Sequence, residues 1–246
     1  MSEAKPDIIS LENLALNAWP AFETSMVGGW ALRYAHGFTK RANSANALST
    51  DAQVTDVLAA TEAFYRQRGL PPIFRLTPLA PPDADALLAD AGYELCEPSL
   101  VMTTRLANPP VPDQIEIAPA ASMEWLEGSA RISGRNSGDL NCHADLLRAI
   151  RTPARFASVR RDGELVAFGM VVIEGISMGL FDIAVTPEQR GLGLGRAVTQ
   201  ALLAQGCREG ALWGYLQVHE HNAVALKLYS SLGFRVAYRY HYRVKT

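Results

Sequence analysis

The sequence predicts a mixed α/β fold made of two similar halves. Segments with strand and helix patterns alternate along the 246 residues, prolines cluster near the middle, and one short motif occurs near the end of each half. With 48% apolar and 20% charged residues, the chain can bury one large core or two small ones. This composition excludes an intrinsically disordered protein.

In the N-terminal half, strand and helix patterns follow one another. Residues 30–34 alternate between apolar and small or polar side chains, which predicts a strand. Apolar residues at helical spacing predict a helix over 54–65 that Gly69 closes. Residues 73–76 have the pattern of a strand and 84–91 that of a helix, and a further strand is expected after Tyr93.

Prolines mark the boundary between the halves. Residues 107–113 include three prolines within four positions. Proline lacks a backbone donor and disfavours helix in the residue before it, so this segment is expected to be an extended connector. We therefore predict a domain over 1–106, a linker over 107–114 and a second domain over 115–246.

In the C-terminal half, the same alternation is clearer. Strands are expected at 156–160, 164–173, 178–185, 212–218 and 234–244, and helices from Leu194 and over 223–232. Asn222 stands where a helix N-cap belongs, and Gly233 can end that helix. Residues 87–93, Leu-Leu-Ala-Asp-Ala-Gly-Tyr, share their skeleton with residues 228–234, Leu-Tyr-Ser-Ser-Leu-Gly-Phe, which indicates an internal duplication.

A glycine-rich segment joins one predicted strand to a predicted helix. Gly191, Gly193 and Gly195 alternate with other residues, so backbone N–H groups can turn toward a ligand just before a helix N-terminus. Arg190 and Arg196 add positive charge, and the segment is therefore suited to bind a pyrophosphate. It lacks the Gly-Lys-Ser/Thr end of a P-loop, and Arg196 occupies the position where a dinucleotide fingerprint needs a small residue.

Two motifs of the C-terminal half resemble a known family. Residues 190–195, Arg-Gly-Leu-Gly-Leu-Gly, match the Arg/Gln-x-x-Gly-x-Gly/Ala signature of the GNAT superfamily of N-acetyltransferases. Residues 222–234 are similar to its second motif, Asn-x-x-Ala-x-x-Leu-Tyr-x-x-x-Gly-Phe. The resemblance extends from about residue 115 to the end, and the N-terminal half resembles a degenerate copy, as in tandem members.

This resemblance implies both a fold and a cosubstrate. The fold would be a mixed, mostly antiparallel sheet flanked by helices, in two tandem copies, with central strands that splay apart. The cosubstrate would be acetyl-CoA, whose acetyl group passes directly to a primary amine of a small molecule or peptide. The alternative is a non-catalytic acyl-CoA-binding or sensor protein. The implied cofactor-binding residues are Ile183, Ala184, Val185, Arg190, Gly191, Leu192, Gly193, Leu194, Gly195, Arg196, Asn222 and Tyr229.

Acetyl transfer needs a neutral amine and a proton donor for the leaving thiolate. Tyr229 matches the family position of the acid. Asp182 matches a frequent acidic position of the family and is the first candidate for the base, Glu220 is its rival, and Glu174 is third.

The N-terminal half lacks the residues that would bind the cosubstrate. Leu88 replaces Tyr229, Pro81 replaces Asn222, and no glycine loop precedes the helix expected near Asp51. We expect this half to bind no acetyl-CoA, to bury one edge of the catalytic half and to wall the acceptor pocket. Residues 41–46 are expected to form a surface turn rather than a pocket loop, and residues 133–139 to form an acceptor-binding loop.

Composition limits the partners. Cys96, Cys142 and Cys207 lie far apart, and the N-terminus lacks a leader pattern, which favours reduced thiols in the cytoplasm. His219 and His221 lack a third ligand, so no metal is expected. A net charge of −2 and a pI of about 6.2 argue against nucleic acid, and the longest uncharged stretch, eleven residues, is too short to span a membrane. A monomer or a homodimer is expected.

Overall fold

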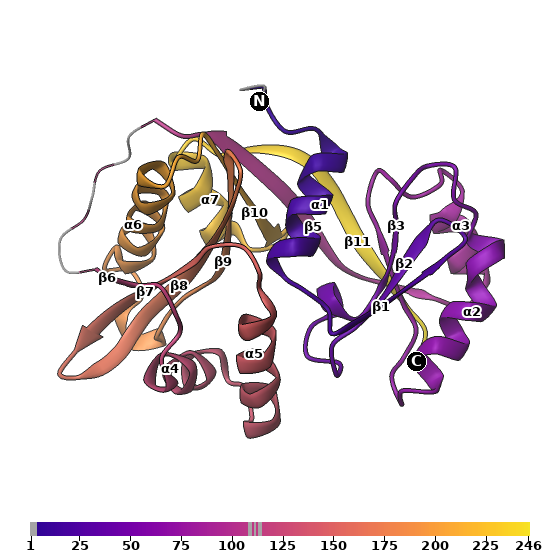
Figure 1. The fold of residues 1–246 in the computed structure, drawn as a ribbon, viewed down its shortest axis with the longest axis horizontal. Helices are drawn as coiled ribbons and strands as arrows, with labels where there is room; N and C mark the ends of the chain where they lie inside the picture. Colours follow the sequence, from indigo (N-terminus) through magenta and orange to yellow (C-terminus); the bar gives the residue numbers. More distant parts are fainter. Residues whose placement is uncertain (1–3, 108–109, 111, 113–114) are drawn as a thin grey trace. The chain divides into compact units, whose positions relative to one another are not determined.

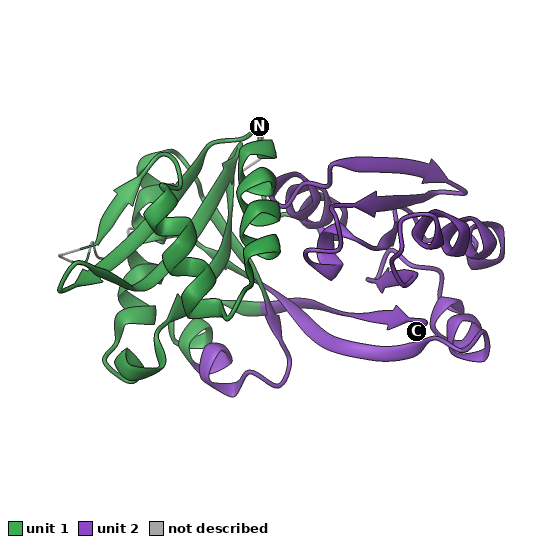
Figure 2. Cartoon of the chain, turned by 90° about the horizontal axis from the view of Figure 1, so that it is seen from below, with its two compact units in different colours: residues 1–6, 103–217, 228–235 green, residues 7–102, 218–227, 236–246 purple. Residues whose placement is uncertain are grey.

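A computed structural model describes residues 4–107, 110, 112 and 115–246 of the chain. The chain forms two compact units, each made of several segments (Figure 2). Unit 1 comprises residues 1–6, 103–217 and 228–235, and unit 2 comprises residues 7–102, 218–227 and 236–246. Each unit thus takes residues from both sides of the predicted linker, most of which lies outside the described residues. That 1–106 and 115–246 are separate domains stays a prediction.

Unit 1 contains a mostly antiparallel sheet flanked by helices, as the sequence predicts (Figure 1). Its strand order is β10-β9-β8-β7-β6, in which only β9 and β10 run parallel among the described pairs. The strands are β6 (Glu116–Ala118), β7 (Ala154–Arg161), β8 (Glu164–Glu174), β9 (Ser177–Val185) and β10 (Trp213–His219), whose last two residues belong to unit 2. The helices are α4 (Met123–Ser133), α5 (Ser137–Ala149) and α6 (Leu194–Arg208).

Helices α4 and α6 pack on opposite faces of β8. Phe168 lies on the α4 face, where its ring centroid is 5.2 Å from that of Trp125. Its neighbour Gly169 lies on the α6 face, since successive strand residues point to opposite sides. A Cβ at Gly169 would lie 2.9 Å from the Ile183 Cγ1 and 3.0 Å from the Val198 Cγ1, so this position requires glycine.

A β-bulge interrupts the pairing of β8 with β9. Phe168 pairs with Ala184 and Met170 with Phe181, so that Asp182 and Ile183 both lie opposite Gly169. Asp182 has a φ of +50°, in the left-handed region that most L-residues avoid. The bulge therefore lies near the C-terminal end of β9, shortly before the glycine segment.

Unit 2 contains the strand order β1-β2-β3-β4-β11 (Figure 1). The strands are β1 (Glu23–Val27), β2 (Trp30–Tyr34), β3 (Ala45–Ala47) and β4 (Ile73–Leu76), and β5 (Glu94–Arg105) and β11 (Arg235–Val244) each have residues in both units. The helices are α1 (Ile8–Ala18), α2 (Val54–Arg66) and α3 (Ala84–Asp90), with α7 (Ala223–Ser231) again divided between the units. Buried Glu12 pairs with buried Arg75 and accepts a hydrogen bond from Tyr238, which joins α1 to β4 and β11.

The predicted duplication is visible in the hydrogen bonds that end α3 and α7. The Tyr93 N–H donates to the Leu88 carbonyl at 2.9 Å, and the Phe234 N–H donates to the Tyr229 carbonyl at 3.1 Å. The glycine before each aromatic residue has a φ of 84° or 90°. The two helices therefore end in the same way, and Leu88 occupies the place of Tyr229.

The expectation of a surface turn at residues 41–46 is wrong. Lys40–Ala42 form a 3₁₀ turn, and residues 42–47 are buried and lead through β3. The Asn43 Oδ1 accepts hydrogen bonds from the N–H groups of Ala35 and Gly37, at 2.7 and 2.9 Å. A polar segment can be buried here because its asparagine satisfies the buried backbone groups around it.

Candidate functional site

The glycine segment forms an exposed bend between β9 and α6. Gly191 and Gly193 have φ values of 79° and 80°, which glycine adopts without strain. Gly193 is the N-cap of the 15-residue α6 and makes no side-chain cap hydrogen bond. Within the described chain, the N–H groups of residues 191–196 have no hydrogen-bond acceptor. These donors, at the positive end of a helix dipole, can bind an anion.

The space beside the bend is open. A Cβ added to Gly191 or Gly193 would meet no atom within 4 Å. A Cβ at Gly195 would lie 3.7 Å from the Val185 Cγ2 and 3.8 Å from the Leu228 Cδ2, ordinary contact distances. The first two glycines therefore face free space, whereas the third packs between β9 and α7.

The two arginines beside the bend are held by neighbouring groups. The Arg190 Nε donates to the Val185 carbonyl at 3.3 Å, and the Arg196 Nη2 donates to the Ser231 Oγ at 2.6 Å. Both arginines are exposed, so their positive charge remains available at the bend.

The strand before the bend has an unpaired edge. Strand β10 pairs with β9 only from Ser177 to Leu180. On the other edge, Ala184 and Val185 pair with β8. Among the described residues, the backbone of 182–185 therefore has no strand partner on the β10 side, which is the separation of central strands that the resemblance implied.

Tyr229 lies near the end of α7, in the part that belongs to unit 1. Its side chain is buried, with a ring centroid 5.9 Å from that of Phe234. Burial raises the pKa of Tyr229 to about 12. The phenol therefore keeps its proton at neutral pH and can donate it in a hydrogen bond.

Asn222 caps α7. Its Oδ1 accepts a hydrogen bond from the Ala225 N–H at 3.1 Å, as its position in the sequence indicated. The Asn222 side chain is exposed. Its role in cofactor binding stays a prediction.

Asp182 belongs to a cluster of three side chains, of which His143 is buried and Asp182 and Arg135 are partly exposed. The Arg135 Nη2 donates to its Oδ1 at 3.2 Å, and the His143 Nε2 lies 2.9 Å from its Oδ2. The Arg135 Nη1 lies 3.0 Å from the His143 Nδ1. Burial alone would raise the pKa of Asp182, but His143 and Arg135 together outweigh it and hold that pKa well below its usual range. A carboxylate in this state is a poor proton acceptor.

The other two candidate bases have different surroundings. The Glu220 Oε1 lies 2.9 Å from the exposed Arg239 Nη2. Glu174 is at the end of β8 that is remote from the bend. The Thr186 N–H, close to the bend, donates to the carbonyl of Val166, and Val166 precedes Glu174 by eight residues on β8. Eight strand residues span roughly 25 Å. The base therefore stays a prediction for Asp182, Glu220 and Glu174 alike.

Comparisons with known proteins show the family of this chain. A family model described as "Probable histone acetyltransferase Rv0428c C-terminal" matches residues 5–243. The "Uncharacterized N-acetyltransferase YobR" of Bacillus subtilis is 31% identical, over 97% of this chain and 99% of its own length. This chain belongs to the GNAT superfamily of N-acetyltransferases.

Solved structures show the same fold as this GNAT protein. A GCN5-related N-acetyltransferase from Kribbella flavida has a TM-score of 0.70, covering 98% of this chain and 96% of its own, at 16% identity. A tandem GNAT protein from the clavulanic acid biosynthesis pathway has a TM-score of 0.67, covering 99% of this chain and 90% of its own, at 14% identity. The second match fits the predicted tandem organisation.

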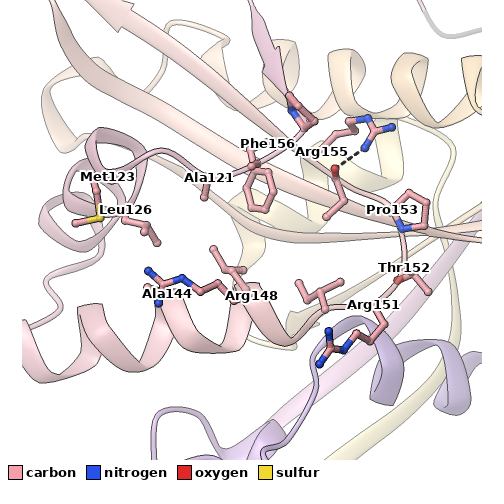
Figure 3. A pocket seen from close by; sticks show the side chains of 15 residues that line it. Ala121, Met123, Leu126, Ala144, Arg148, Arg151, Thr152, Pro153, Arg155 and Phe156 are labelled. Carbon is pink, nitrogen blue, oxygen red and sulfur yellow. Dashed lines mark hydrogen bonds between the residues drawn. The ribbon is translucent and has the colours of Figure 1, made fainter.

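A further cavity of about 660 Å³ lies between α4, α5 and the start of β7 in the GNAT protein (Figure 3). Its walls combine apolar side chains, such as Met123 and Phe156, with the three arginines Arg148, Arg151 and Arg155. None of the residues predicted for catalysis or cofactor binding lines it. The predicted site residues therefore lie outside this cavity.

Sequence reasoning missed Arg135 and His143. Arg135 lies within the predicted acceptor-binding segment 133–139, which links α4 to the start of α5. The sequence did contain one signal for α5, because Asn136 and Asp139 form a capping box.

Across the described ranges, no group of three His, Cys, Asp or Glu side chains is placed to hold a metal ion. No helix in these ranges is long and apolar enough to cross a membrane.

Proposed function

We propose that this GNAT protein takes acetyl-CoA as its acetyl donor and acetylates a primary amine of a small molecule or peptide. The observation that carries the proposal is the exposed bend at residues 191–196. It combines unpaired N–H groups, open space and a helix N-terminus. These features fit the diphosphate group of acetyl-CoA.

The residues around the bend fit the rest of the donor. Arg190 and Arg196 supply positive charge beside the diphosphate position. On the side where β10 no longer pairs with β9, the backbone of Ile183, Ala184 and Val185 would offer hydrogen bonds to the amides of a pantetheine arm. Acetyl-CoA, when bound, supplies the activated thioester.

Tyr229 would assist the leaving thiolate by hydrogen bonding. Its pKa of about 12 exceeds the ordinary thiol value of about 8.5, so complete proton transfer would cost on the order of 5 kcal/mol. A hydrogen bond to the developing thiolate needs no such transfer and still lowers the barrier. Tyr229 would therefore act as a hydrogen-bond donor that keeps its own proton throughout, and solvent would protonate the thiolate product.

The test is a combined binding and turnover experiment. Calorimetry with acetyl-CoA measures donor binding, and a thiol reagent measures release of free CoA with a panel of amines. Because the matching family model is described as a probable histone acetyltransferase, lysine peptides belong in the panel beside small primary amines. We expect binding and amine-dependent thiol release. Absence of binding contradicts the proposal, and binding without turnover on any amine favours a sensor.

A further inference from the structure

Each carboxylate oxygen of Asp182 has a side-chain nitrogen close to it, at 3.2 Å for Oδ1 and 2.9 Å for Oδ2. Oδ1 accepts from Arg135, in the segment between α4 and α5, and Oδ2 lies beside His143, within α5. Because Arg135 can only donate, the His143 Nδ1 must accept from it, which leaves the ring proton on Nε2, next to Asp182. Arg135 and His143 therefore contact the Asp182 carboxylate in the protein without an amine substrate.

Most of the cluster surface is covered by protein, and the Arg135 side chain is 19% exposed. The side chain of His143 is 1% exposed and that of Asp182 is 14% exposed. Trp125 of α4 packs against His143, with ring centroids 6.0 Å apart, and Trp125 also contacts Phe156 and Phe168 of the sheet. The cluster thus fixes a point of β9 to the layer formed by α4 and α5.

That point is where β9 departs from regular geometry. Asp182 and Ile183 share one partner, Gly169, and the φ of Asp182 is +50°. Aspartate, asparagine and glycine enter this backbone region more readily than other residues. The three residues that follow, Ile183 to Val185, form the edge without a β10 partner.

We propose that Asp182 is a positioning residue and not the proton acceptor: Arg135 and His143 clamp its carboxylate, and the clamp holds the bulge that presents residues 183–185 to the donor. This inference rests on the proposed function. The clamp would order β9 whether or not a donor is bound, so its effect can also be measured in the protein without acetyl-CoA.

Three variants separate positioning from proton transfer. Asp182→Asn keeps an acceptor for Arg135 and tolerates the positive φ, so acetyl-CoA affinity should stay within about threefold of wild type and kcat within about tenfold. Asp182→Ala loses both the clamp and the favoured backbone, so acetyl-CoA affinity should fall at least tenfold. Arg135→Met should weaken acetyl-CoA binding in the same direction.

The control is Asp162→Ala in the hairpin between β7 and β8. Asp162 is exposed and has a φ of 51°, close to the 50° of Asp182. Its replacement is therefore the same chemical change at nearly the same backbone angle. It should leave acetyl-CoA affinity unchanged.

Hydrogen exchange of residues 181–185 in the protein without ligand supplies a readout that needs neither donor nor amine. Asp182→Ala and Arg135→Met should speed exchange there, and Asp182→Asn should not. If Asp182 is instead the base, all Asp182 variants lose kcat by about the same factor, the acidic limb of the pH–rate profile disappears in Asp182→Asn, and donor affinity stays constant. Either that pattern or unchanged exchange in Asp182→Ala and Arg135→Met overturns the proposal. Failure of the proposed function would appear differently, as wild-type protein that binds no acetyl-CoA.

Discussion

Replacing Gly193 by glutamate tests the anion site directly. Gly193 is the N-cap of α6 with a φ of 80°, and a Cβ added there would meet no atom within 4 Å. The new side chain therefore fits without a clash in the protein without ligand. Its carboxylate would lie in the space that the proposal gives to the diphosphate.

The expected loss of affinity follows from Coulomb's law. A carboxylate about 6 Å from a diphosphate carrying two negative charges, at an effective dielectric constant of about 40, costs roughly 3 kcal/mol. This corresponds to a loss of about 100-fold in affinity for acetyl-CoA. High salt should reduce the loss, because the site is exposed.

The matched control is Gly210→Glu. Gly210 has a φ of 92°, also has free space around its Cβ position, and follows the opposite end of α6. A 15-residue helix separates the two positions by about 22 Å. Both variants carry the same charge and a similar backbone strain. Calorimetric affinity of Gly193→Glu within threefold of wild type, or an equal loss in Gly210→Glu, would refute the reasoning.

Three further predictions concern Tyr229, Asn222 and Asp182. Tyr229→Phe removes only the hydroxyl and should lower kcat about 100-fold with donor affinity unchanged; initial rates and calorimetry check this, and an unchanged kcat would exclude the hydrogen-bond donor role. Asn222→Ala removes the cap of α7 and should destabilise the fold by about 1 kcal/mol in urea unfolding, whereas Asn222→Ser should restore most of it; equal stability of all three proteins would contradict the cap. The pKa of Asp182 is lower in the folded than in the unfolded chain, so the unfolded state binds protons first and stability should fall as the pH drops below about 5. Unfolding curves between pH 7 and 3 should show a smaller fall for Asp182→Asn, and identical pH dependence would count against the clamp.

Local chemistry made the glycine segment and α7 predictable. Gly191 and Gly193 adopt positive φ values because glycine alone does so freely, and a strand before them and a helix after them follow from residue periodicity. The Asn222 cap and Gly233 stop of α7 are equally local. The bend and its flanking strand and helix could therefore be predicted from the sequence.

The contacts of Asp182 and the burial of Asn43 depend on long-range packing, which the sequence does not indicate. Arg135 is 47 positions from Asp182, and nothing near Asp182 in the chain indicates that an arginine and a histidine would lie close to its two oxygens. Burial of Asn43 depends likewise on backbone groups of residues 35–39 that only the folded loop brings to its side chain. A polar segment such as 41–46 resembles a surface turn until these partners are known.

A crystal structure of the protein with acetyl-CoA would show directly where the diphosphate binds. We expect diphosphate oxygens within hydrogen-bond distance of the N–H groups between Gly191 and Gly195, and the pantetheine arm along Ile183 to Val185. A diphosphate bound elsewhere, with no ligand at these N–H groups, would contradict it.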